Sequence, residues 1–90
     1  MTRKSRRRKA TRQLNKVKAL VRDCSSREVV DLYRLHDFEI VNRSNHDMAE
    51  HNSYPHNFPI PRHKMLSPGV VRKAIKHIEE FRGSCYYDYD

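Results

Sequence analysis

The spacing of apolar residues predicts two amphipathic helices in the body of the chain. We expect the first to run from Ser25 to about His36 and the second from Ser67 to Gly83. The apolar face of the first consists of Val29, Leu32, Tyr33 and His36, and that of the second consists of Val71, Ala74, Ile75, Ile78 and Phe81. Each helix therefore has one face to bury against a shared core.

The ends of both helices carry residues that favour helix termini. Ser25 can accept a hydrogen bond from the amide of Glu28, whose carboxylate can reach back to the amide of Ser25, which is the pattern of a capping box. Ser67 is a good N-cap, and proline suits the position after it because that amide has no helical partner. Asp37 is expected to end the first helix as a turn former.

The segment between the helices predicts short strands. Residues 38–42 alternate in polarity at their start and indicate a strand, residues 43–47 are polar and typical of a turn, and residues 48–52 indicate a second strand. Residues 56–61 are expected to be extended because they contain two prolines. Pro59 and Pro61 cannot donate ladder hydrogen bonds, so this strand is expected at a sheet edge.

The N-terminal segment has a different character. Residues 1–9 are predicted to be disordered because their like charges repel and nothing apolar can be buried. Residues 10–23 are expected to form a basic helix with an apolar stripe. The stripe consists of Leu14, Val17, Leu20 or Val21, and Cys24, and the opposite face consists of Arg12, Lys16 and Arg22.

These elements predict an α+β fold, α-β-β-β-α, with a three-stranded antiparallel sheet and two helices on one face, preceded by an extra basic helix. This is also the layout of the double-stranded-RNA-binding fold. We divide the chain into a basic arm at 1–24, a body at 25–83 and an acidic, aromatic tail at 84–90. The tail is expected to fray or to fold back onto a basic surface.

The charge is concentrated in the arm. The chain has 19 basic and 11 acidic residues and a formal net charge of +8, yet residues 1–22 hold ten of the basic residues and no acidic one. The remainder is slightly acidic, so the basicity belongs to the arm. Such an arm attracts polyanions through counterion release but reads no sequence by itself.

Other site classes find little support in the sequence. Two cysteines form no metal-binding pair and are too few for a disulfide scaffold, which favours a reducing cytoplasm. The four histidines His46, His51, His56 and His63 match no zinc-ligand spacing, so we expect no metal and no cofactor. Apolar runs are too short for a membrane span, and we expect no membrane association through one.

The C-terminal half resembles a known family. Residues 58–75, FPIPRHKMLSPGVVRKAI, resemble the segment of HicA toxins that joins the last strand to the last helix. Residues 28–35 and 38–41 resemble the first helix and strand of that family, so the resemblance covers about residues 25–80. The glycine–serine–histidine element of the family aligns with Ser44, Asn45 and His46, where only the histidine is kept. Asp47 stands where a second histidine is common, and Asp37 replaces a customary glycine.

The resemblance implies the toxin of a bacterial or phage-borne type II toxin–antitoxin system, acting in the cytoplasm. Such toxins are metal-independent endoribonucleases that cleave mRNA, stop translation, and are neutralised by a HicB-like antitoxin in a hetero-oligomer. It implies that His46 is the general acid/base, because an imidazole titrates near operating pH. The predicted RNA contacts are Arg43, Arg62, His63, Lys64, Gly69, Arg72, Lys73 and Lys76.

Two other functions remain open from the sequence. The changes around His46 are compatible with a non-catalytic RNA-binding module of the same fold. The arm is compatible with a basic accessory protein of nucleic acid or the ribosome, in which residues 1–22 make most of the contacts.

Overall fold

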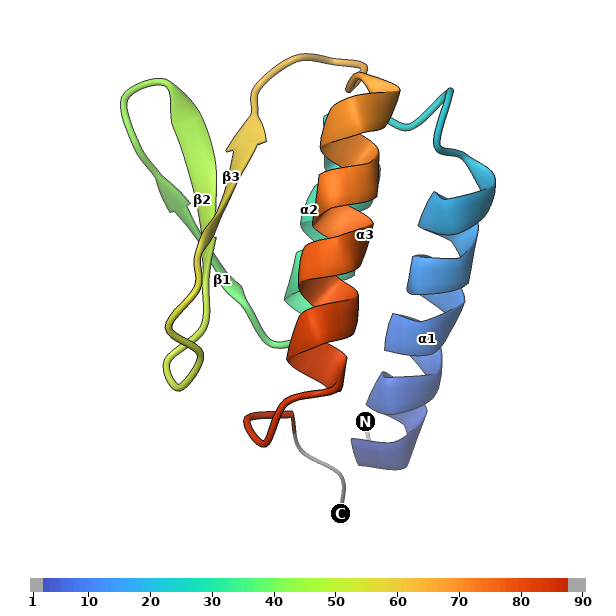
Figure 1. The fold of residues 1–90 in the computed structure, drawn as a ribbon, viewed down its shortest axis with the longest axis vertical. Helices are drawn as coiled ribbons and strands as arrows, with labels where there is room; N and C mark the ends of the chain where they lie inside the picture. Colours follow the sequence, from blue (N-terminus) through green and yellow to red (C-terminus); the bar gives the residue numbers. More distant parts are fainter. Residues whose placement is uncertain (1–2, 88–90) are drawn as a thin grey trace.

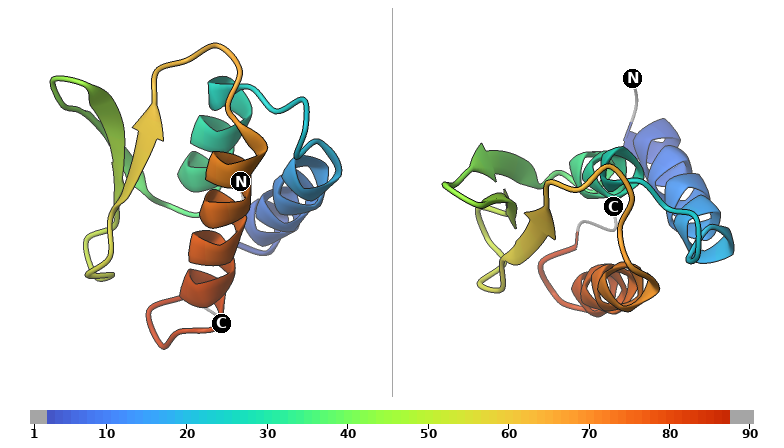
Figure 2. Two further views of the ribbon diagram at one scale, coloured as in Figure 1. Left: turned by 45° about the horizontal axis from the view of Figure 1, so that its top comes forward. Right: turned by 90° about the horizontal axis from the view of Figure 1, so that it is seen from above.

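The computed structural model describes residues 3–87, with side chains from residue 6 onward. It confirms the α+β class with a three-stranded antiparallel sheet. The elements are α1 (Arg3–Ala19), α2 (Ser26–Leu35), β1 (Glu39–Asn42), β2 (His46–Glu50), β3 (Phe58–Pro61) and α3 (Pro68–Arg82). Figures 1 and 2 show α2 and α3 as a middle layer, with the sheet on one side and α1 on the other. Within residues 3–87, one face of the sheet is therefore left without a helix.

The strands are adjacent in chain order, β1-β2-β3, and each neighbouring pair is antiparallel. The pairing brings Ile40 opposite Ala49 and Ala49 opposite Phe58. Ala49, Phe58 and Ile60 are buried, whereas residues on alternate positions of the same strands are partly or fully exposed. Because side chains alternate between faces, the buried set faces the helices and the other set forms the open face.

The hairpin between β1 and β2 corrects one prediction. We expected residues 43–47 to form the turn, but β2 already begins at His46. The backbone N–H of Arg43 donates to the carbonyl of His46 over 2.9 Å, which closes the hairpin around Ser44 and Asn45. A two-residue connection of polar residues is sufficient for an antiparallel hairpin. His46 is therefore a strand residue, and β2 lies two residues earlier than predicted.

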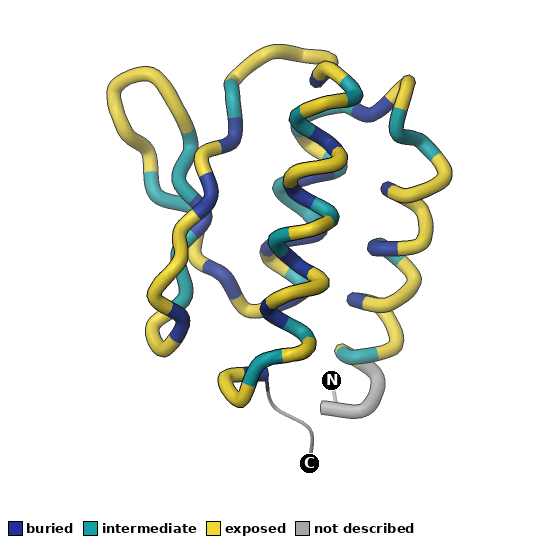
Figure 3. Tube along the Cα trace, viewed as in Figure 1, coloured by how far each residue is buried: buried dark blue, intermediate teal, exposed yellow. Residues whose placement is uncertain are grey.

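The N-terminal helix corrects a second prediction. Residues 1–9 were expected to be disordered, but α1 is continuous from Arg3; residues 1–2 lie outside the described residues. Ala10, Leu14 and Val17 are buried. Figure 3 shows that the buried positions of α1 lie on the side that faces the other helices. The helix ends at Ala19, four residues before the predicted end. Tertiary packing of one apolar stripe thus stabilises a helix that its charge alone opposes.

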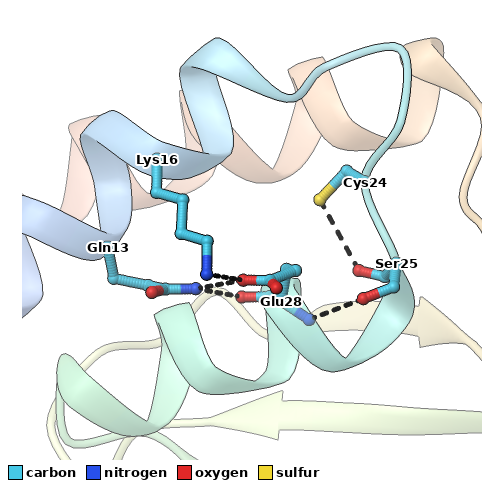
Figure 4. Close-up of polar contacts among 5 residues, drawn as sticks. All are labelled: Gln13, Lys16, Cys24, Ser25 and Glu28. Carbon is cyan, nitrogen blue, oxygen red and sulfur yellow. Dashed lines mark hydrogen bonds and ion pairs between the residues drawn. The ribbon is translucent and has the colours of Figure 1, made fainter.

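Acidic groups of the body offset the charge of α1. Lys18 forms an ion pair with Glu79 over 2.6 Å, and Lys16 forms one with Glu28 over 3.3 Å. Gln13 donates to the Glu28 carboxylate and to its backbone carbonyl, both over 3.0 Å, as Figure 4 shows for the carboxylate. The hydrogen bond from Gln13, and to a smaller extent the contact with Lys16, hold the pKa of Glu28 below its ordinary value. The Glu28 carboxylate therefore contacts α1.

The predicted caps Ser25, Ser67 and Gly83 are confirmed, but the reciprocal half of the capping box is not, because the Glu28 carboxylate contacts Gln13 and Lys16 of α1 and not the Ser25 amide. Ser25 accepts from the amide of Glu28 over 3.2 Å, Ser67 accepts from the amide of Val70 over 3.4 Å, and Gly83 is the C-cap of α3. Just before α2, a short β-bridge between Ser25 and Met65 ties the α1–α2 connection to the β3–α3 connection. The N-termini of α2 and α3 are thereby fixed side by side at one end of the molecule (Figure 1).

Candidate nucleic-acid interface

The sequence-predicted site residues lie on three segments. Arg43 and His46 flank the β1–β2 hairpin turn, and Arg62, His63 and Lys64 follow β3. Figure 1 shows that this hairpin and the β3–α3 connection lie at the same end of the molecule. The remaining candidates lie along α3, which starts at that end: Gly69, Arg72, Lys73 and Lys76.

Arg62 holds the hairpin in place. Its Nε donates to the Asp47 carboxylate over 3.0 Å, and its two terminal nitrogens donate to the carbonyls of Ser44, over 3.4 Å, of His46, over 3.2 Å, and of Arg43. A guanidinium presents several donors in a rigid plane, so a single side chain can bind several carbonyls of a turn. The hydrogen bonds of Arg62 therefore fix the position of the hairpin relative to the end of β3.

The His46 side chain lies on the open face of the sheet. Its neighbours along β2, Asp47 and Ala49, face the helices, and His46 alternates with them. His46 is exposed, and its ring has no hydrogen-bond partner among residues 3–87, while its carbonyl is held by Arg43 and Arg62. The backbone is thus fixed and the imidazole is accessible, which is the arrangement that a proton-transfer group on RNA requires.

Asp47 does not orient the neighbouring imidazole. Residues 43–47 were expected to form the turn, but Asp47 is a half-buried residue of β2 that pairs with Arg62. Successive strand residues point to opposite faces, and the carboxylate is therefore on the other side of the sheet from the His46 ring.

Arg43 is engaged by a neighbouring carboxylate. Its guanidinium donates to Glu50 over 2.8 Å, and both residues lie on the open face together with His46. The pair is largely exposed, so solvent weakens it, and a phosphate can compete for the guanidinium. Arg43 therefore places a positive charge on the open face, across the hairpin from His46.

Exposed basic residues precede α3 and line one of its faces, and together they are named the cationic stripe. His63, Lys64, Arg72, Lys73 and Lys76 are exposed, and their side chains have no hydrogen bond or ion pair with another of the described residues. On α3, Gly69, Arg72, Lys73 and Lys76 follow the spacing of one helix face, and the first turn carries no acidic residue. A Cβ at Gly69 would meet nothing within 4 Å, so this corner is open to solvent. This stripe is suited to a polyanion.

A pocket that sequence reasoning missed lies at the opposite end of the molecule from the hairpin. It has a volume of about 310 Å³ and is lined by Arg6, Arg7, His36, Asp37, His51, Phe81, Tyr86 and Tyr87. Arg6 pairs with Asp37 over 2.8 Å, and the Arg7 guanidinium lies 5.1 Å from the centre of the Tyr87 ring. The tail therefore folds back onto basic groups as far as Tyr87, one of the two outcomes expected for it; residues 88–90 lie outside the described part. No local motif signals this region, because its residues come from distant segments.

Two histidines have structural roles near this region and in the core. His36 is 1% exposed; its Nδ1–H donates to the carbonyl of Leu32 over 2.8 Å, and its Nε2 accepts from Arg82 over 2.9 Å. Burial lowers the pKa of His36 to about 4. His77 joins Tyr33 and the carbonyl of His56, each over 2.8 Å, and burial also lowers its pKa. Both rings are therefore neutral parts of the fold at pH 7.

Residues 3–87 contain no group of three or more histidine, cysteine or carboxylate side chains placed to hold a metal ion. Within the same range, no helix is both long and apolar enough to cross a membrane. Cys24 is buried and Cys85 is exposed, and both are free thiols. The chain matches no protein family, no curated protein and no solved structure.

Proposed function

We propose that this protein is a metal-independent endoribonuclease, the toxin of a type II toxin–antitoxin system, that cleaves mRNA with His46 as general acid/base. The observation that carries the proposal is the accessible His46 imidazole, fixed through its backbone and placed at the same end of the molecule as an exposed cationic stripe. The resemblance of residues 25–80 to HicA toxins supports it.

Cleavage of RNA without a metal requires proton transfer at two oxygens. The ribose 2′-OH loses a proton as it attacks the adjacent phosphate, and the leaving 5′-oxygen gains one. The His46 ring is assigned both transfers: it takes the proton from the 2′-OH as a base and then gives a proton to the leaving 5′-oxygen as an acid. Arg43, on the same face, offers positive charge to the phosphate as it becomes more anionic. The candidate stripe formed by His63, Lys64, Arg72, Lys73 and Lys76 is assigned to the RNA backbone.

The position of Asp37 also supports the resemblance. Asp37 has a φ of 68°, in the left-handed region that favours glycine, and it stands where the family has a customary glycine. The backbone after α2 therefore has the conformation that the family's residue would permit without strain.

A non-catalytic RNA-binding module is the alternative that a specific observation favours. Arg43, which flanks the hairpin turn, and Arg62, which donates hydrogen bonds to it, both bind acidic groups of the protein itself. The third function, in which the arm makes most of the contacts, receives less support, because Arg6, Lys16 and Lys18 pair with Asp37, Glu28 and Glu79.

The test is cleavage of a long RNA by the purified chain in EDTA, compared with His46→Ala. We expect His46→Ala to lower the cleavage rate by a factor of about 100 or more while RNA binding is retained. His56→Ala is the matched control, because it removes another exposed imidazole that lies in the β2–β3 connection. Equal cleavage by wild type and His46→Ala contradicts the assignment, and binding without cleavage by the wild type favours the non-catalytic module.

The partner expected for such a toxin is a HicB-like antitoxin. The direct way to silence the site is to cover both the imidazole and the cationic stripe, so we expect the complex to bury His46. A complex in which the His46 ring stays fully exposed to solvent contradicts this mode of neutralisation.

A further inference from the structure

The two edges of the sheet differ in their ability to accept another strand. In the order β1-β2-β3, both β1 and β3 have one free side. In an antiparallel ladder, alternate residues direct their N–H and C=O groups to opposite sides of the strand. A free edge that retains its N–H groups is a template for a further strand, whereas proline removes the donor.

The edge formed by β3 is closed to a further strand. Pro59 is paired with Met48 and Pro61 with His46 across β2 and β3. Proline has no N–H to donate, so these two pairs are the non-hydrogen-bonded ones, and their backbone groups face the free side. Both outward positions of β3 therefore lack a donor.

The edge formed by β1 is open. The Arg43 amide donates to His46, so Arg43 directs its backbone toward β2, and by alternation so do Val41 and Glu39. Ile40 and Asn42 then direct their N–H and C=O groups away from β2. Among residues 3–87, no strand lies beyond β1, and each of these two residues retains its donor and its acceptor.

We propose that β1 pairs antiparallel with β1 of a second copy of this chain, about a twofold axis that passes through Val41. In this register Ile40 of one copy lies opposite Asn42 of the other, and the outward N–H and C=O groups of both residues are satisfied. Val41 lies opposite Val41 in a non-hydrogen-bonded pair. The product is a six-stranded antiparallel sheet.

Charge selects this register and the identity of the partner. Glu39, Val41 and Arg43 all lie on the open face, and pairing about Val41 places Glu39 of each copy opposite Arg43 of the other. A shift of the axis to Asn42 places both charges opposite neutral residues. A shift to Ile40 places Glu39 opposite Val41 and leaves Arg43 opposite Asp37, which precedes β1 and already pairs with Arg6. A strand with an acid and a base at equal distances from its centre is complementary to itself, which favours a second copy over an unrelated strand.

The open face continues across the proposed interface. Val41, Met48 and Pro59 lie in one row, since Val41 pairs with Met48 and Met48 with Pro59. Pairing about Val41 joins this row to its symmetry mate, so that a longer apolar row crosses the middle of the enlarged sheet. The charged residues of the open face lie on either side of this apolar row.

Cysteine cross-linking tests the register directly. In a Cys85→Ser background, which removes the exposed thiol and leaves the buried Cys24, we expect Val41→Cys to form a covalent dimer on mild oxidation. Residues of a non-hydrogen-bonded antiparallel pair have Cα atoms about 4.5 Å apart, within the range of a disulfide. Met48→Cys is the matched control, because it lies on the same face but three strand spacings, about 14 Å, from its mate. Cross-linking of Val41→Cys no faster than Met48→Cys overturns the proposal.

Sedimentation of unmodified chains tests the interface without a cross-link. We expect the wild type to dimerise at high micromolar concentration and Asn42→Pro to raise the dissociation constant by about tenfold or more, because half of the intermolecular hydrogen bonds are lost. Circular dichroism checks that Asn42→Pro keeps its fold, since its N–H makes no bond to β2. Glu39→Arg and Arg43→Glu should each weaken the dimer, and the double variant should restore it. A wild type that remains monomeric at millimolar concentration, or a double variant no better than the singles, overturns the proposal.

Discussion

Folding stability should depend on the protonation of His36 in mildly acidic solution. The His36 ring is buried between α2, α3 and the tail, and its Nε2 accepts a hydrogen bond from Arg82. Protonation would place a second N–H against the Arg82 guanidinium and would bring a charge out of water. Burial, the larger cause, and Arg82 together lower the pKa of His36 to about 4 in the folded chain.

The sign and size of the effect follow from proton linkage. The folded pKa lies below the unfolded value, near 6.5, so the unfolded chain binds the proton more readily and the stability that His36 contributes above pH 6.5 is lost as the pH falls. Between pH 7 and pH 4.5 the loss from this one ring is about 2.5 kcal/mol. His77, whose pKa is also lowered by burial, contributes a loss of the same sign.

Urea unfolding followed by circular dichroism, at steps between pH 7 and pH 4.5, measures this dependence. We expect the free energy of unfolding of the wild type to fall across the window and that of His36→Gln to fall by about 2.5 kcal/mol less, because the amide does not titrate. His63→Gln, which removes an exposed imidazole, is the control. Parallel curves for wild type and His36→Gln would refute the reasoning, because the buried ring would then contribute nothing to the pH dependence.

Substitutions at three further positions test the packing and the backbone. Asp37→Gly should be more stable than Asp37→Ala by about 1 kcal/mol in urea unfolding, because both lose the pair with Arg6 but only glycine relieves the φ of 68°. Tyr33→Phe should lower the free energy of unfolding by about 1 kcal/mol, because the Nδ1 atom of His77 loses its donor; an unchanged value contradicts the assigned bond. Phe81→Ala should cost about 3 kcal/mol or more, since this ring is 1% exposed in the core, and a thermal melt within error of the wild type contradicts that role.

Local signals predicted the helices and the edge strand because their causes are local. The Ser25 and Ser67 caps depend on hydrogen bonds that span three residues, and the apolar stripe of α3 depends on spacing alone. The two prolines of β3 placed it at an edge for a reason that needs no knowledge of the rest of the sheet. These features are therefore accessible to an argument from the sequence.

The order of α1 had a cause that the sequence pattern does not display. The basic residues among 1–9 appeared to repel one another, but Arg6 pairs with Asp37, which is distant in sequence. The Arg7 guanidinium likewise lies 5.1 Å from the centre of the Tyr87 ring in the distant tail. A count of the charges within the arm leaves out both of these contacts, and for that reason the sequence analysis predicted disorder.

The sequence predicted which residue types lie at the candidate site, but not which of them bind other groups of the protein and which remain exposed. Arg62 was expected to contact RNA, yet its donors are directed to Asp47 and to carbonyls of the hairpin. That arrangement depends on the two-residue turn, which sets the register of β2 and so decides on which face His46 lies. Residue composition identifies cations near a turn, whereas only the register shows which of them remain exposed.

Substitutions of the bound and the exposed cations should therefore affect the proposed ribonuclease in different ways. Arg62 touches the hairpin backbone on both sides of Ser44 and Asn45, so its effect on RNA cleavage would pass through the position of His46. Lys73 and Lys76 project from a rigid helix with no described side-chain partner, so their effect would pass through affinity for the phosphate backbone and its salt dependence. Placement of the reacting group and attraction of the substrate are thus separate properties in this fold, because the sheet supplies one and α3 supplies the other.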